Sequence, residues 1–143
     1  GNYILPSTQK VWLPDSNKVR REMLQALQAY PIPSTSNPVP GLVKAFKDFK
    51  PMDPENADKN IAVYIFGDEF PMAAAPVLQQ IHKLNPKDPE TKNRRVVINA
   101  TGFPFRLPKN PRPDGTGCKY ANLMRQLTYE HGGAFMVVSA DRL

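Results

Sequence analysis

The sequence has 143 residues but only one cysteine, Cys118, and no long apolar run. A single cysteine excludes an internal disulfide and a zinc site built from several cysteines. No apolar run approaches the roughly 20 residues that a membrane-spanning helix needs, so no membrane partner is expected. A Gly-rich phosphate loop and a nucleophile-elbow motif are also missing. The sequence therefore carries no enzyme signature.

Proline, in contrast, is abundant, and its 16 copies divide the chain. They cluster at 31–40, 51–54, 86–89 and 104–113, which predicts loops there and regular structure between them. The length predicts one domain over residues 1–143. The net charge is +6, but the cations are spread along the chain. A nucleic-acid face usually needs clustered cations interleaved with aromatics, so no nucleic-acid partner is expected.

Apolar runs at 61–66, 95–100 and 134–138 predict three strands. The first run is continuously apolar, which is typical of a strand buried on both faces. Helical spacing of apolar residues fills the intervals, with one helix ending near Leu84 and another over 120–131. Strands that alternate with helices predict an α/β fold. We expect a three-layer, Rossmann-like, doubly wound and mostly parallel sheet.

The first 60 residues predict two further helices. One begins after an N-cap at Asp15 or Ser16 and runs to about Tyr30, and a shorter one spans 42–49. Short extended pieces are expected at 2–5 and 11–13. Near the other end of the chain, the Pro- and Gly-rich segment 104–118 predicts a loop.

Ligands of such sheets bind beyond the carboxyl ends of the strands. Asp68 and Glu69 follow the first predicted strand, and Thr101 follows the second. The two carboxylates suit a hard divalent cation, or they favour the positive N-terminus of the next helix. The segment 34–37 (Ser-Thr-Ser-Asn) offers further oxygen ligands, or caps a helix through Ser36 or Asn37.

The two histidines lie on different predicted helices. His82 is expected on a helix flank. His131 precedes two glycines and is expected at a helix C-terminus, where its charged form is favoured. Their spacing matches no recognised zinc motif.

Four segments follow one another in the order of a known family. They are Ser-Thr-Ser-Asn-Pro at 34–38, Ile-Phe-Gly-Asp-Glu-Phe at 65–70, Ile-Asn-Ala-Thr-Gly-Phe at 98–103 and Gly-Gly-Ala-Phe at 132–135. With them the chain resembles a bacterial von Willebrand factor A-type domain from about residue 2 to 138.

The resemblance implies binding of a protein ligand at a metal-ion-dependent adhesion site that holds Mg²⁺. Asp68 and Ser36 (or Thr35) would be metal-associated residues. The ligand would lie near the remaining candidates, which are Ser34, Asn37, Glu69 and Thr101.

The chain departs from the family in one respect. The family's Asp-x-Ser-x-Ser motif on its first strand is absent, so the chain begins at the equivalent of the third strand. Three explanations are open: the chain is a fragment of a longer protein, which we favour; its sheet is completed by another chain or a second copy; or its N-terminal segment pairs differently. Two other functions also stay open, a Rossmann-like nucleotide-binding or enzymatic domain and a structural assembly domain.

Overall fold

The computed structural model describes residues 3–31, 37–103 and 115–138. These residues form three strands and four α-helices, joined in places by short 3-10 turns. In chain order the elements are the turn Pro6–Thr8, α1 (Asn17–Ala29), α2 (Val39–Phe49), the turn Pro54–Asn56, β1 (Ile61–Gly67), α3 (Ala74–Leu84), β2 (Val96–Gly102), α4 (Thr116–Glu130) and β3 (Phe135–Val137).

The three strands make one parallel sheet in the order β1-β2-β3. The pairing of β1 with β2 is in register along seven residues, from Ile61 opposite Val96 to Gly67 opposite Gly102. The predicted α/β class and parallel pairing are therefore confirmed. Within the described ranges, β1 and β3 each have β2 as their single strand neighbour.

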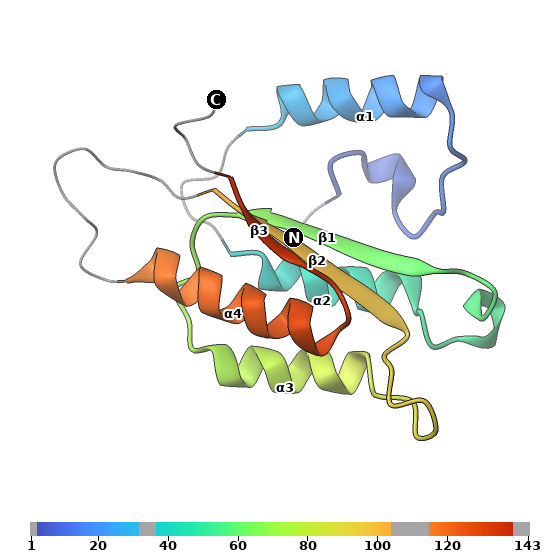
Figure 1. Ribbon diagram of the computed structural model, residues 1–143. Coiled ribbons are helices and arrows are strands. Elements are labelled where there is room, and N and C mark those ends of the chain that lie inside the picture. Colours follow the sequence, from blue (N-terminus) through green and yellow to red (C-terminus); the bar gives the residue numbers. More distant parts are fainter. Residues whose placement is uncertain (1–2, 32–36, 104–114, 139–143) are drawn as a thin grey trace, which may run out of the picture.

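Helices α2, α3 and α4 lie together on one side of this sheet, whereas α1 stands apart from them (Figure 1). The core fills the space between the sheet and helices α2, α3 and α4, and α1 contributes no buried residue. Seven of its apolar members have no exposed surface: Phe70, Ile81, Val96, Ile98, Leu123, Met124 and Leu127. The described residues thus pack one helix layer against the sheet, and not the two that a three-layer fold requires. No helix among them is long and apolar enough to cross a membrane.

Strand β1 is covered on one face only. Ile61, Val63 and Ile65 turn toward the helices, whereas Tyr64 and Phe66 are 67% and 64% exposed. The prediction that this strand is buried on both faces is therefore wrong. A continuous apolar run is typical of a strand in a sheet with helices on both sides, but in the described part of the chain no helix packs on the second side. We call this surface the open face; it consists of Ala62, Tyr64, Phe66, Val97, Asn99, Thr101 and Met136.

Several element boundaries also differ from the sequence expectations. Ser16 caps α1 as predicted, because its side chain accepts a hydrogen bond from the amide of Val19. The residues described within 2–5 and 11–13 are not strands. Helix α4 begins at Thr116, so the loop predicted over 104–118 is wrong for its last three residues.

Gly133 provides a test of the close approach between β2 and the turn that precedes β3. A Cβ atom at Gly133 would stand 1.9 Å from the carbonyl oxygen of Ile98. We expect Gly133→Ala to lower the free energy of unfolding by about 3 kcal/mol, because the two backbones must separate. Urea denaturation followed by circular dichroism measures the change.

The matched control is Gly41→Ala in α2, where a new Cβ meets nothing within 4 Å. Removing a glycine from a helix should raise the free energy of unfolding by up to about 1 kcal/mol. Equal unfolding midpoints for the two variants would contradict the close approach.

Candidate functional site

The carboxyl ends of β1 and β2 lie side by side, because the parallel register pairs Gly67 with Gly102. The amide of Phe103 donates to the carbonyl oxygen of Gly67 at 2.9 Å and extends the pairing by one residue. Asp68 and Glu69 therefore leave the sheet beside Thr101. The structure thus brings these three predicted site residues together at the carboxyl end of the sheet.

Tyr120 of α4 is buried against the same end of the sheet. Its hydroxyl donates to the carbonyl oxygen of Thr101 at 3.1 Å. Burial, together with the negative charge of Asp68, raises the pKa of Tyr120 to about 12, so the hydroxyl keeps its proton near neutral pH.

Gly67 makes room for the Tyr120 ring, and Gly102 makes room for the ring of Phe135. A Cβ atom at Gly67 would come within 3.0 Å of the Tyr120 ring, and one at Gly102 within 3.2 Å of the Phe135 ring. On sequence alone, Tyr120 is only the first residue of the helix predicted over 120–131. The glycine at the end of each strand is the signal that points to a bulky neighbour.

Asn37 lies one residue before the N-cap of α2, which is Pro38, so the predicted cap at Asn37 is wrong by one position. Its side-chain oxygen accepts a hydrogen bond from the amide of Val39 at 3.1 Å, in the first turn of α2. Its amide nitrogen lies 3.7 Å from the sulfur of Met72, beyond the end of β1. The hydroxyl-bearing candidates of this loop, Ser34, Thr35 and Ser36, lie outside the described residues.

Asp68 and Glu69 are both half-buried. No group of three or more His, Cys, Asp and Glu side chains in the described part of the chain could hold a metal ion. The pairing of Asp68 with Ser36 or Thr35 around Mg²⁺ therefore stays a prediction.

The open face adds a second surface next to the carboxyl end of the sheet. Phe66, Thr101 and Met136 form one row across the three strands, with Thr101 in the middle. Met136 is 63% exposed, and Phe103 stacks on Phe66 with ring centroids 6.4 Å apart. Thr101, predicted as a ligand-binding residue, thus lies between two large apolar side chains, Phe66 and Met136.

Ionisable side chains gather near the start of β2, at the other end of the sheet. His82 of α3 pairs with the carboxylate of Glu130 in α4, as expected for a residue on a helix flank. Arg94 donates to the main-chain carbonyl of Glu130 at 3.0 Å. These contacts join α3, α4 and the start of β2.

His131 follows α4, as predicted, and its ring centroid lies 5.8 Å from that of His82. The side chain is buried, and its Nε2 atom has no hydrogen-bond partner among the residues that the structure describes. Burial lowers the pKa of His131 to about 4. The expectation that its charged form is favoured is therefore wrong, because the loss of solvent outweighs the helix terminus.

No family model matches the chain, and no curated protein and no solved structure matches it. The von Willebrand A-type resemblance accordingly rests on the four sequence motifs. The candidate site rests on geometry, namely the strand ends at Asp68 and Thr101 and the open face beside them.

His131 makes the stability of the protein depend on pH. Its pKa is about 4 in the folded protein and 6.5 in the unfolded chain. Below pH 6.5 the His131 side chain binds a proton in the unfolded chain but not in the folded protein, so the free energy of unfolding falls as the pH drops toward 4. We expect a loss of about 2 kcal/mol between pH 7 and pH 5, measured by urea denaturation at both values.

The control is His131→Gln, which lacks the titrating ring but keeps His82 and Glu130. Between pH 7 and pH 5, the free energy of unfolding of this variant should fall by only a small part of the loss expected for the wild-type protein. The same loss in both proteins would show that His131 is not the group responsible.

Proposed function

We propose that this chain is a protein-binding domain of the von Willebrand A type that joins a partner through the open face of its sheet. The observation that carries the proposal is the exposure of Tyr64 and Phe66 on β1. Exposed apolar patches of this kind mark interaction sites. Aromatic residues and methionine are enriched at the centres of such interfaces.

The type of sheet supports the same proposal. Purely parallel sheets occur almost only with both faces covered. In this chain α2, α3 and α4 cover one face, and the row Phe66–Thr101–Met136 lies on the other. A partner that covers this row would supply the layer that the described residues lack. This is also the arrangement expected of an assembly domain completed by another chain.

A binding role needs no catalytic step, and no observation favours an enzyme. A nucleotide site would require backbone amides that cradle phosphate at the end of a strand. At the end of β1 the chain instead has Asp68 and Glu69. Their negative charges repel phosphate.

The von Willebrand A-type resemblance adds Mg²⁺ to the proposal, with Asp68 as a ligand together with Ser36 or Thr35. A hard cation takes oxygen ligands and retains several water molecules. It would then contact an acidic group of the protein partner, next to the aromatic row of the open face.

Magnesium titration tests this part of the proposal. At one hundred times its dissociation constant, Mg²⁺ should raise the free energy of unfolding by about 2.7 kcal/mol, because it binds the folded state. A thermal-shift titration measures the effect, and Asp68→Ala should abolish it. Asp58→Ala, at an exposed acidic residue before β1, is the matched control and should keep it. If wild-type protein shows no shift, the metal is lost from the proposal and the protein partner stands.

Site-specific photocrosslinking tests the partner itself. A benzoylphenylalanine is placed at position 66 in place of Phe66, and the variant is produced in cells of the organism that makes this protein. Irradiation of these cells should give a discrete protein adduct, because the partner covers the open face. The same group in place of Gln79, exposed on α3, is the control and should give none. Equal labelling from both positions, or none from position 66, contradicts binding through the open face.

A further inference from the structure

The outer edge of β1 carries a row of backbone groups with which no described residue pairs. Because the carbonyl of Gly67 accepts from Phe103 of the β2 side, Gly67 and every second residue before it direct their peptide groups toward β2. The alternate residues Ala62, Tyr64 and Phe66 therefore direct their N–H and C=O groups away from the sheet. No backbone group in the described ranges pairs with them. The edge thus offers three donors and three acceptors in line.

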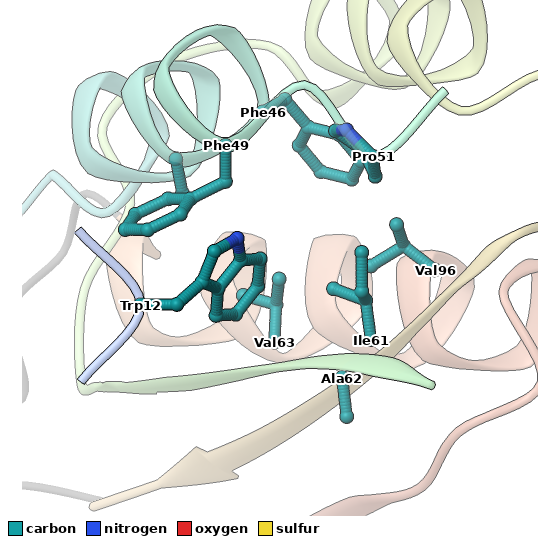
Figure 2. Close-up of a pocket in the computed structure, with 9 residues that line it drawn as sticks. Trp12, Phe46, Phe49, Pro51, Ile61, Ala62, Val63 and Val96 are labelled. Carbon is teal, nitrogen blue, oxygen red and sulfur yellow. The ribbon is translucent and has the colours of Figure 1, made fainter. Parts of the chain in front are cut away.

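A cavity of about 210 Å³ lies beside the same edge (Figure 2). Trp12 lies between Phe49 of α2 and strand β1, and its ring centroid is 4.7 Å from that of Phe49. Ile61 and Val63 of β1 point into this space, whereas Ala62 points to the other side of the strand. We call this space the Trp12 cavity. A dry cavity of about 150 Å³ already holds a benzene molecule, so this one has room for a large apolar side chain.

Helix α2 restricts what can reach the edge. Its residues Ala45, Phe46 and Phe49 line the Trp12 cavity together with β1, so the helix stands over the edge. A second copy that paired through its own β1 would bring its own α2 to the same space, and the two helices would collide. A single extended segment has no such helix and can lie along the edge beneath α2.

The geometry points to the edge of β1 as a docking site for an extended apolar segment of a partner protein, which adds a fourth strand to the sheet. The added strand pairs with the backbones of Ala62, Tyr64 and Phe66. Its alternate side chains enter the Trp12 cavity, and the remaining ones extend the open face. Strand addition of this type draws affinity from backbone bonds and specificity from pockets for alternate side chains.

The net charge of +6 favours a partner segment flanked by acidic residues, because opposite charges speed association. This inference rests on the proposed function and specifies how the partner is held.

A short peptide of alternating residues tests the inference. The probe is acetyl-Glu-Leu-Thr-Leu-Thr-Leu-Thr-Glu-amide, and the readout is the emission of Trp12, the one tryptophan of the chain. Because the indole is half exposed at the cavity, a bound leucine should shift its emission to shorter wavelength. Absence of any saturable shift overturns the inference.

Two N-methylated versions of the peptide identify strand pairing. In an added strand, the amides of one alternate set face β1 and the others face away. One version carries methyl groups on the three leucine amides, and the other carries them on the three threonine amides. The two versions should therefore bind with very different affinities. One version should bind about tenfold more weakly or worse, because it loses backbone bonds, and the other should bind within about twofold of the parent. Equal affinities of the two versions overturn strand addition.

Two substitutions in β1 probe the same bonds from the protein side. Tyr64→Pro and Tyr64→Thr both remove the ring, but only proline removes the outward N–H. Because that N–H has no partner in the sheet, an edge strand tolerates the proline. The proline variant should bind the peptide at least about fivefold more weakly than the threonine variant, and equal affinities contradict the inference. Should the proline variant fail to fold, as judged by circular dichroism, the methylated peptides decide.

The peptide experiment and the photocrosslinking fail separately. A protein adduct at position 66 without discrimination between the two methylated peptides leaves the proposed function standing and removes strand addition. Loss of the adduct removes the proposed function itself.

Discussion

The two-residue period of the β1–β2 pair determines most of what surrounds it. In a parallel ladder, residues that share a register share a face, so Ile65 and Ala100 turn together toward the helices. Tyr64 and Phe66 are then forced to the other face, whatever their hydrophobicity. The same period also decides which peptide groups of β1 remain at the edge. The core, the open face and the free edge are thus three results of one pairing.

Side-chain contacts fix the helices at both ends of this pair. At the start of β2, the buried side chain of Asn85 exchanges two hydrogen bonds with the backbone of Val96, and so attaches the end of α3 to the strand. At the other end, the Tyr120 hydroxyl attaches α4 to Thr101. A buried amide or hydroxyl is stable only when it is hydrogen-bonded. These contacts therefore hold the strand ends, and Asp68 with them, in a defined position.

Local patterns in the sequence were sufficient to predict the three strands, the helices and the cap at Ser16. They were also sufficient to bring Asp68 and Thr101 to one edge, because parallel strands end together. They could not predict that Tyr64 and Phe66 are exposed, since an apolar run has the same appearance with one or two faces covered. Nor could they predict that His131 is uncharged at neutral pH, because its burial depends on how α3 and α4 pack. Both failures concern neighbours that are distant in the sequence.

Helix α1 contributes no buried residue, which has a consequence for cooperativity. An isolated helix shorter than about 12–15 residues is marginal in water, and the 13 residues of α1 are close to that limit. Its helical state therefore gains little from the folding of the sheet. The chain then behaves as two units, a sheet domain that unfolds as a whole and a terminal helix whose amides exchange with solvent through local opening. The order of α1 is set by whatever lies against it, and not by the core.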